Sequence, residues 1–235
     1  MSTVSPQLPL ALRYPPDQRL ETLVAADGVV AQLAAFAAAR QRQSLLVTGA
    51  AGTGKTHVAI AVCAEAERLG RRVAFVPARS AAGRLQDAVA ALHDCDLVAI
   101  DGLDGIAGNR ADEIALFDLH NRLHDAGRLA LYTATAAPDA LALTLPDLRS
   151  RLGQAARIHL AALDDAGRHA MLRLRAERRG LQMDAAAIDW LLRRSDRDLP
   201  ALTALLDRID RASLASQRRV TVPFVRQLLA GDGAL

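Results

Sequence analysis

One octapeptide constrains this chain more than any other feature. Residues 49–56 read Gly-Ala-Ala-Gly-Thr-Gly-Lys-Thr, the pattern of a phosphate-binding loop. An apolar run at residues 45–47 precedes it as a short buried strand, and residues 57–69 follow with the spacing of a helix. Glycines let successive backbone N–H groups surround a phosphate, and the amino end of the next helix adds partial positive charge. This order predicts a nucleotide-binding α/β domain.

Lys55 is the one lysine among the 29 lysine and arginine residues, and it lies inside this loop. A compact ammonium group on a flexible chain can reach nucleotide phosphates, where a planar guanidinium would fit poorly. We therefore interpret the loop as functional, with Lys55 pairing with the β- and γ-phosphates and the Thr56 hydroxyl coordinating Mg²⁺. The predicted nucleotide contacts from the loop are Gly49, Ala50, Ala51, Gly52, Thr53, Gly54, Lys55, Thr56 and His57.

Composition places the chain among folded globular proteins. Of 235 residues, 51% are hydrophobic and 23% are charged, which excludes a disordered or fibrous chain. The net charge of +3 does not demand nucleic-acid binding. Cys63 and Cys95 are isolated and predict reduced, packed thiols. Because no basic and apolar leader and no apolar run of about 20 residues is present, we expect a soluble cytoplasmic protein without a membrane partner.

Strands and helices alternate in the first two thirds of the sequence. Short apolar runs predict strands at 45–47, 73–76, 97–100, 129–133 and 157–160. Helical spacing occurs at 28–40, 57–69, 80–92 and 111–126. This alternation predicts a five-stranded parallel sheet covered on both faces. The later segments all have helical spacing, at 164–179, 184–194, 199–216 and 223–230. We predict a proline-containing tail at 1–16, an α/β domain at 17–162 and a small all-helical domain at 163–235.

Asp101 follows the apolar strand at 97–100, so its carboxylate is expected at the carboxyl edge of the sheet beside the phosphate loop. Thr56 and Asp101 are therefore the predicted Mg²⁺ ligands. The residue after Asp101 is Gly102, whereas vigorous ATPases of this type carry an acid there that orients the attacking water. The nearest acid, Asp104, lies on the next loop. We expect slow intrinsic hydrolysis, and a nucleotide that holds a conformation for a partner.

The assembled motifs resemble the AAA+ family and, within it, the DnaA-like branch. They are the phosphate loop, Asp101, the polar strand end at 132–135, Leu-Pro-Asp-Leu-Arg-Ser-Arg-Leu at 145–152, and a helical lid. Further stretches similar to this branch are 114–123, 205–213, 217–219 and 222–225. The resemblance covers nearly the whole chain and is greatest to regulators that consist of DnaA without its DNA-binding domain. It implies ADP or ATP with Mg²⁺ as cofactors and DnaA as partner.

By this resemblance, Arg151 is an arginine finger offered in trans to the γ-phosphate of ATP on DnaA, a contribution typically worth roughly 10³ to 10⁵ in rate. Arg149 is the nearest alternative, and a solvated helix arginine is the competing interpretation. Arg197 matches the sensor 2 position, with a surface salt bridge as the alternative. Thr133 and Thr135 both remain candidates for sensor 1, because one sequence does not fix the register.

Residues 7–12, Gln-Leu-Pro-Leu-Ala-Leu, resemble the motif by which the family docks on the DNA polymerase sliding clamp. The implied clamp contacts are Gln7, Leu8, Leu10 and Leu12. An ordinary proline-containing tail is the alternative for so short a motif. DNA association would be indirect, through the clamp, because the sequence leaves no room for a helix-turn-helix after the lid. The implied function is stimulation of ATP hydrolysis by DnaA, a negative regulation of replication initiation.

Two other functions remain open. A helicase-loader-like, DNA-engaging AAA+ ATPase would need a basic DNA track and vigorous turnover, which Gly102 disfavours. A small-molecule kinase would need an acceptor pocket under an arginine-bearing lid. His120 and His124 lie four residues apart, but the sequence offers no obvious third zinc ligand. Whether the protein is a monomer or a homodimer is not indicated by its residues.

Overall fold

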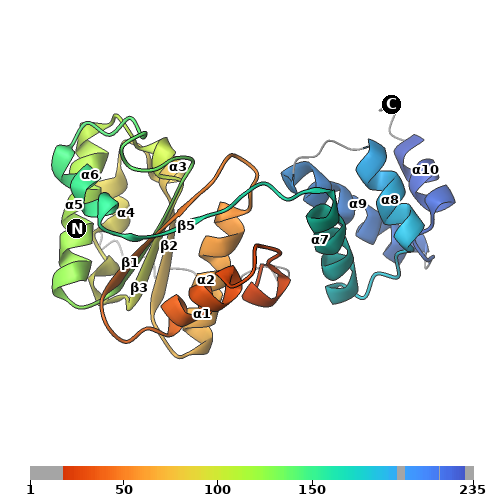
Figure 1. Cartoon of the computed structure of the whole chain (residues 1–235), viewed down its shortest axis with the longest axis horizontal. Coiled ribbons are helices and arrows are strands. Elements are labelled where there is room, and N and C mark those ends of the chain that lie inside the picture. Colours follow the sequence, from red (N-terminus) through yellow and green to blue (C-terminus); the bar gives the residue numbers. More distant parts are fainter. Residues whose placement is uncertain (1–17, 195–198, 217, 231–235) are drawn as a thin grey trace, which may run out of the picture.

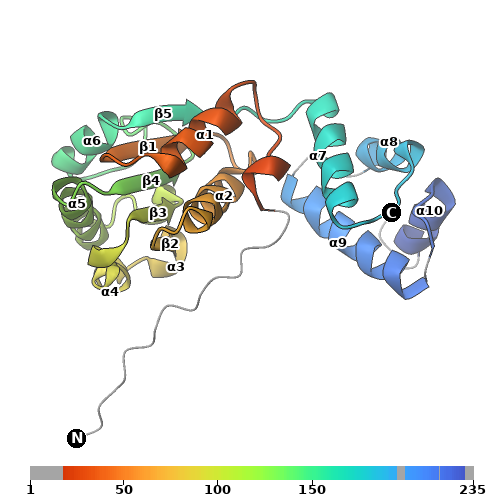
Figure 2. The same cartoon turned by 90° about the horizontal axis from the view of Figure 1, so that it is seen from below.

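The computed structural model describes residues 18–194, 199–216 and 218–230. Figures 1 and 2 show an α/β domain on one side and a separate group of helices on the other, joined by an extended segment after β5. The predicted clamp-binding motif at 7–12 and the sensor 2 candidate Arg197 lie outside the described residues.

The α/β domain is built on five parallel strands in the order β2-β3-β4-β1-β5. Their bounds are Gln43–Thr48 for β1, Val73–Pro77 for β2, Leu97–Asp101 for β3, Leu129–Ala134 for β4 and Ala156–His159 for β5. The predicted five-stranded parallel sheet is confirmed. Because β1 lies between β4 and β5, the phosphate loop leaves the sheet from an interior strand, next to the end of β4.

Helices cover both faces of the sheet. One face carries α1, Val29–Ala38, and α2, Lys55–Arg68. The other carries α3, Ala78–Ala81, α4, Leu85–Val89, α5, Arg110–Asp125, and α6, Pro146–Gly153. Short 3-10 turns lie at Leu20–Thr22 (η1), Leu92–Asp94 (η2) and Leu103–Gly105 (η3). Successive strand residues face opposite layers, so Leu45 and Val47 pack toward α1 and α2 while Leu46 packs toward α5.

The single helix predicted at 80–92 is wrong, because the chain is broken there into α3, α4 and η2. Gly83 adopts a φ of +82°, a conformation that ends a helical turn and favours glycine. The carboxylate of Asp112, only 1% exposed on α5, accepts hydrogen bonds from the backbone N–H of Gly83 at 2.6 Å and of Leu85 at 3.0 Å. A buried carboxylate needs such donors, and the interruption of the helix leaves these two N–H groups available to it.

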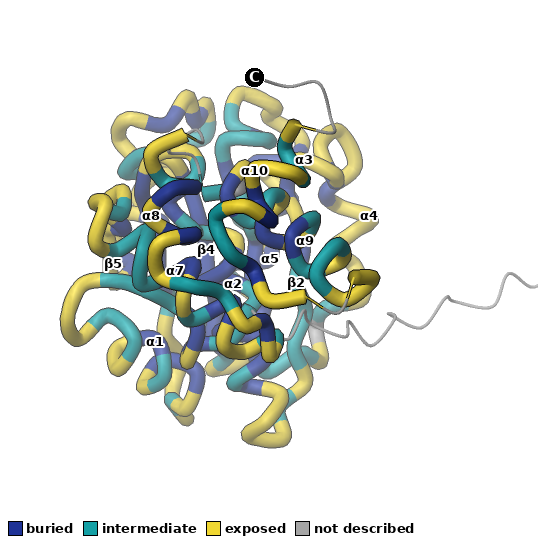
Figure 3. Tube along the Cα trace, turned by 90° about the vertical axis from the view of Figure 1, so that its right-hand side faces the viewer, coloured by how far each residue is buried: buried dark blue, intermediate teal, exposed yellow. Residues whose placement is uncertain are grey.

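The second group of helices, which we call the lid, comprises α7, Asp165–Arg178, α8, Ala185–Arg194, α9, Leu199–Ser216, and α10, Val222–Ala230. Its core gathers apolar side chains from all four helices, among them Leu172, Trp190, Leu206 and Phe224. Figure 3 shows buried segments on the helices of the lid alternating with exposed ones. The predicted all-helical lid is confirmed. Within the described ranges, no helix is long and apolar enough to cross a membrane.

Candidate nucleotide site

The phosphate loop connects the end of β1 to the start of α2, and two of its glycines are dictated by the fold. A Cβ atom on Gly49 would lie 2.5 Å from the carbonyl oxygen of Leu160, so no larger residue fits there without displacement of the backbone. Gly54 is the residue before α2 and has a φ of +94°, which side chains rarely adopt. The loop therefore requires glycine both for a close contact and for its conformation.

Lys55, the first residue of α2, extends back over the loop that it follows. Its Nζ donates to the carbonyl oxygens of Gly49 and Ala50, each at 2.7 Å. Burial lowers the pKa of Lys55, while the carboxylates of Asp104 and Asp101 oppose that shift. The ammonium group and both carboxylates thus gather at the carboxyl edge of the sheet, where the sequence places a nucleotide phosphate.

The structure brings Thr56, Asp101 and Thr133 together from three different elements. The Thr56 hydroxyl donates to Oδ2 of Asp101 at 2.8 Å, and the Thr133 hydroxyl donates to Oδ1 at 2.6 Å. Thr133 is fully buried and also accepts a hydrogen bond from the backbone N–H of Gly102 at 2.8 Å. A hydroxyl beside a carboxylate is an all-oxygen donor set of the kind Mg²⁺ prefers, so these residues fit the ion that the sequence predicts.

The two sensor 1 candidates contact different acids. Thr133 binds Asp101, whereas the backbone N–H of Thr135 donates to both carboxylate oxygens of Asp104, at 2.9 and 3.2 Å, and its hydroxyl donates to the same group. Asp104 follows Asp101 by three residues on η3, yet it lies close enough to Lys55 to influence its pKa. The site therefore contains a second acid, Asp104, which the sequence analysis had assigned to the next loop.

A cavity of about 410 Å³ opens between the phosphate loop and the lid, within the usual range for small ligands. Its apolar wall comes from Leu23, Val24, Leu163 and Met171. The loop residues from Gly52 to His57 contribute a polar part of its lining. An apolar wall next to a phosphate loop suits a nucleotide, because a base has flat apolar faces and the phosphates are charged.

One buried lid residue in this cavity was missed by the sequence analysis. Arg175 on α7 is only 8% exposed and donates to Thr203 on α9 at 2.7 Å and to His57 on α2 at 3.3 Å. A signal was available, because Arg175 occupies the same helical face as the buried Met171 and Leu172. A charged residue at a core position of an amphipathic helix indicates a buried polar contact.

Comparisons with known proteins divide the chain in the same way as its structure. The model of an IstB-like ATP-binding protein matches residues 20–134, and that of the Hda lid domain matches residues 165–229. Domain III of Thermotoga maritima DnaA is 20% identical with a TM-score of 0.77, and the match covers 93% of this chain and 98% of that chain. The chain is an Hda/DnaA-like AAA+ protein.

Two further solved structures share the AAA+ fold. AMPPCP-bound DnaA from Aquifex aeolicus is 19% identical with a TM-score of 0.66, and the match covers 83% of this chain and 66% of that chain. The Thermotoga maritima RuvB branch migration motor is 19% identical with a TM-score of 0.66, and the match covers 92% of this chain and 72% of that chain. This chain thus spans about two thirds of the length of the Aquifex DnaA.

In this Hda/DnaA-like AAA+ protein, the finger candidate Arg151 lies on α6. Figures 1 and 2 both show α6 at the end of the α/β domain that is farthest from the lid, so Arg151 does not reach the chain's own cavity. Arg151 is half-buried, and its side chain makes no hydrogen bond or ion pair with the residues that the structure describes. Arg149, by contrast, donates to the carbonyl oxygen of Leu143 near the start of its own helix.

His120 lies close to Arg151, and its buried ring has a hydrogen-bond partner inside the protein. Its Nδ1 is 2.9 Å from the hydroxyl of the buried Tyr132 on β4. Burial, together with the positive charge of Arg151 and the neighbouring His124, lowers the pKa of His120. The described part of the chain contains no group of three or more histidine, cysteine or acidic residues able to hold a metal ion. His120 therefore packs against Tyr132 on β4, and its lowered pKa favours the neutral ring.

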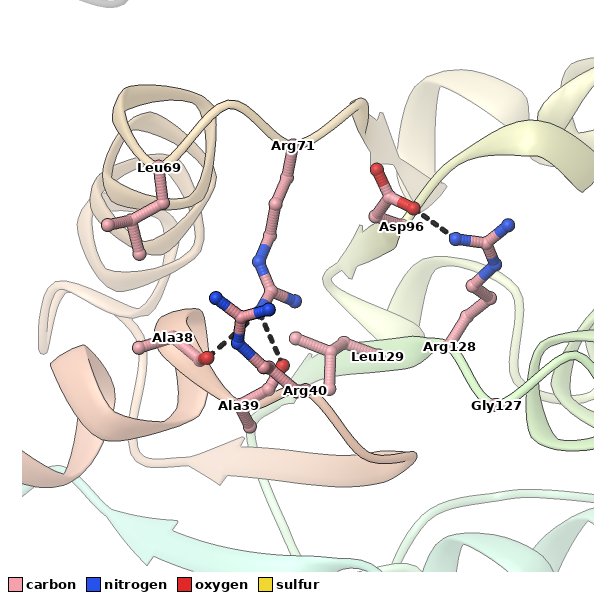
Figure 4. A pocket seen from close by; sticks show the side chains of 9 residues that line it. All are labelled: Ala38, Ala39, Arg40, Leu69, Arg71, Asp96, Gly127, Arg128 and Leu129. Carbon is pink, nitrogen blue, oxygen red and sulfur yellow. Dashed lines mark hydrogen bonds and ion pairs between the residues drawn. The ribbon is translucent and has the colours of Figure 1, made fainter.

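A second cavity, of about 640 Å³, lies at the opposite edge of the sheet, where β3 and β4 begin. Figure 4 shows Arg71 extending to the carbonyl oxygens of Ala38 and Ala39, at 2.9 and 2.5 Å, while Arg128 pairs with Asp96. These contacts fasten the end of α1 and the start of β4. Arg71 and Arg128 therefore have structural roles away from the phosphate loop.

Proposed function

We propose that this protein binds ADP or ATP with Mg²⁺ and inactivates DnaA by stimulating its ATP hydrolysis, and so limits replication initiation. The observation that carries the proposal is the position of Arg151, which lies on an accessible helix away from the chain's own cavity. This position keeps the guanidinium away from the chain's own nucleotide site and leaves it available to a nucleotide held by another subunit. The lid, which matches the Hda model, supports DnaA as that subunit.

In this proposal, the chain's own nucleotide is held by the phosphate loop. Lys55 and the loop N–H groups bind the phosphates, and Thr56 and Asp101 hold Mg²⁺. Thr133 orients the Asp101 carboxylate through the bond at 2.6 Å. Bound Mg²⁺ would neutralise phosphate charge. Because the cavity has walls from both the α/β domain and the lid, the nucleotide would also fix the angle between them.

Arg151 then acts on the partner. A guanidinium presents a fork of donors that matches the oxygens of a γ-phosphate, and its charge stabilises the transition state of phosphoryl transfer. The pKa of the neighbouring His120 is lowered from its ordinary value, which favours the neutral ring over a second positive charge beside Arg151 at neutral pH. Arg149 is less suited, because its guanidinium is engaged with the backbone of Leu143.

Tethering to the sliding clamp is the second part of the proposal and rests on the motif at residues 7–12. A short peptide that docks on the clamp would keep the protein at replicating DNA and raise its local concentration near DnaA. DNA contact would then be indirect. Replacing Leu10 and Leu12 by alanine should abolish clamp-dependent stimulation while leaving nucleotide binding unchanged.

The test is phosphate release from ATP-loaded DnaA in the presence of clamp-loaded DNA. Wild-type protein with ADP should accelerate release, and Arg151→Ala should remove that acceleration, by roughly 10³ or more. Arg151→Lys, which keeps the charge but not the fork, should recover little of it. Arg149→Ala is the matched control and should retain stimulation. No acceleration by folded, nucleotide-bound wild type would refute the proposal.

One observation favours the rival function of a DNA-engaging ATPase. Asp104, held by Thr135 and close to Lys55, supplies the site with an acid that can orient a water molecule. One of the DnaA structures that share this fold is bound to AMPPCP and single-stranded DNA. This rival function requires the protein to hydrolyse ATP in the absence of DnaA. The rate of hydrolysis should rise when DNA is added and should be lost in Asp104→Asn. DNA titrations at several salt concentrations distinguish the two functions.

A further inference from the structure

Three segments that are distant in sequence meet at the ring of His57. His57 belongs to α2, directly after the phosphate-loop residue Thr56, and is only 8% exposed. Its Nε2 is 3.0 Å from the carbonyl oxygen of Arg19, which precedes η1, and 3.4 Å from the Thr22 hydroxyl. Its Nδ1 is 3.3 Å from Nη2 of Arg175 on α7. The ring therefore connects the segment before α1, the phosphate-loop helix and the lid.

The partners determine how His57 is protonated. A guanidinium only donates hydrogen bonds, so Nδ1 must accept from Arg175. A carbonyl oxygen only accepts, so Nε2 must carry the proton and donate to Arg19. Both contacts together require the neutral ring with its proton on Nε2. A second proton on Nδ1 would remove the acceptor and place a positive charge against the Arg175 guanidinium.

Arg175 is itself fixed within the lid. Its Nη1 donates to the Thr203 hydroxyl on α9 at 2.7 Å, and Thr203 donates in turn to the carbonyl oxygen of Leu199 at 2.8 Å. The guanidinium thus spans two lid helices and the phosphate-loop helix. Because both ends of this fork are held, the position of His57 relative to α7 and α9 depends on Arg175.

We propose that Arg175 is a positioning residue of the nucleotide site, which holds the lid against the phosphate loop through His57 and thereby sets both nucleotide affinity and the lid angle. Both side chains line the 410 Å³ cavity, on its lid and loop sides. The contact therefore forms part of the wall of the space that a nucleotide would fill. This inference rests on the proposed nucleotide binding.

Affinity for a fluorescent mant-ADP with Mg²⁺ provides the first test. Arg175→Met should weaken binding by about 10- to 100-fold, the usual effect of losing hydrogen bonds to a charged group. Arg175→Lys should not restore it, because an ammonium group cannot bridge His57 and Thr203 as a fork does. Arg173→Ala, an exposed arginine on the same helix, is the matched control and should bind like wild type.

Variants of His57 separate positioning from simple packing. His57→Asn keeps an acceptor near the place of Nδ1 and should bind mant-ADP within about threefold of wild type, whereas His57→Leu should lose as much as Arg175→Met. The double variant that combines His57→Leu with Arg175→Met should lose no more than either single change, because residues in one network are not additive. Losses that multiply, or wild-type affinity in Arg175→Lys, would overturn the inference.

The lid angle has its own readout in Trp190, the one tryptophan of the chain, which lies in the lid core. Energy transfer from Trp190 to mant-ADP at saturating ligand should change in Arg175→Met and His57→Leu but not in Arg173→Ala. Unchanged transfer in all variants would refute the positioning role. The emission of Trp190 without ligand shows whether the lid of each variant is folded. If the lid of Arg175→Met is unfolded, Thr203→Val is a milder variant that removes the same hydrogen bond from Arg175. Failure of the wild type to bind mant-ADP would instead refute the nucleotide site itself.

Discussion

The hydroxyl of Thr133 lies 2.6 Å from Oδ1 of Asp101 and donates to it, although the two residues belong to different strands, β4 and β3, and are 32 positions apart. The other carboxylate oxygen accepts from Thr56. Both oxygens of Asp101 are therefore oriented by protein hydroxyls on either side. This arrangement presents the carboxylate to the phosphate loop in a single orientation.

Replacing Thr133 by valine should lower the free energy of unfolding by about 1–3 kcal/mol, because the N–H of Gly102 and one oxygen of Asp101 lose their partner inside the protein. Urea unfolding followed by circular dichroism measures the change. Thr135→Val, at an exposed position, is the comparison and should cost less. Equal losses in the two variants would contradict a special role for Thr133.

Lys55→Arg should bind MgADP no better than Lys55→Ala, and both should lose about 10- to 100-fold in affinity. The ammonium reaches two loop carbonyls at 2.7 Å in a half-buried space that a planar guanidinium would not fit. Isothermal titration calorimetry gives the affinities. Near-wild-type binding by the arginine variant would show that positive charge alone is sufficient at this position.

Gly49→Ala should destabilise the protein by about 1–3 kcal/mol, because the new methyl group would meet the Leu160 carbonyl oxygen at 2.5 Å. Gly153→Ala is the matched control, since the nearest atom there lies 3.9 Å away and α6 gains a better helix former. Thermal unfolding distinguishes the two. The prediction is refuted if both substitutions shift the midpoint by the same amount.

Glu113→Gln should cost about 1.5–3 kcal/mol of stability at pH 7, with a penalty that shrinks in acid. Burial alone would raise the pKa of Glu113, but hydrogen bonds from the backbone of Thr144, Gly108 and Leu145 and from the Thr144 hydroxyl outweigh it and hold the pKa below its ordinary value of 4.5. A lowered pKa stabilises the fold above pH 4.5, and that contribution is lost as pH falls through the folded value.

Urea unfolding of wild type and Glu113→Gln at pH 7 and near pH 3 tests this prediction. The two proteins should differ most at pH 7 and converge at the lower pH. Because Glu113 holds the segment that leads into α6, the variant should also weaken stimulation of DnaA under the proposed function. A penalty that stayed constant with pH would show that the carboxylate charge is not what holds this segment.

The sheet could be predicted from sequence because its strands are short apolar runs that alternate with helices, and periodicity records such burial directly. The interruption of the helix expected at 80–92 could not be predicted. It depends on Asp112, a residue 29 positions from Gly83, whose carboxylate accepts a hydrogen bond from the Gly83 N–H. Local spacing carries no information about such a contact. Gly83 was the one local indication of the break.

In the candidate site, too, local motifs could be predicted and contacts between distant elements could not. The phosphate loop and Asp101 are local motifs, and the structure brings them together as their sequence implies. Which of Thr133 and Thr135 contacts Asp101 depends on strand register, which the pairing of β3 with β4 fixes. Arg175 was missed because its partners, His57 and Thr203, come from other elements.

Lys55 carries the one side-chain amine of the chain, and the fold places it in the wall of the nucleotide cavity. Reagents that acylate amines therefore have a single side-chain target, whose labelling peptide mapping separates from that of the α-amino group, and a bound nucleotide would shield it. The extent of labelling then reports how many molecules hold nucleotide, without any engineered probe. For the same reason, immobilising or crosslinking the protein through lysine would block the site that such an experiment is meant to study.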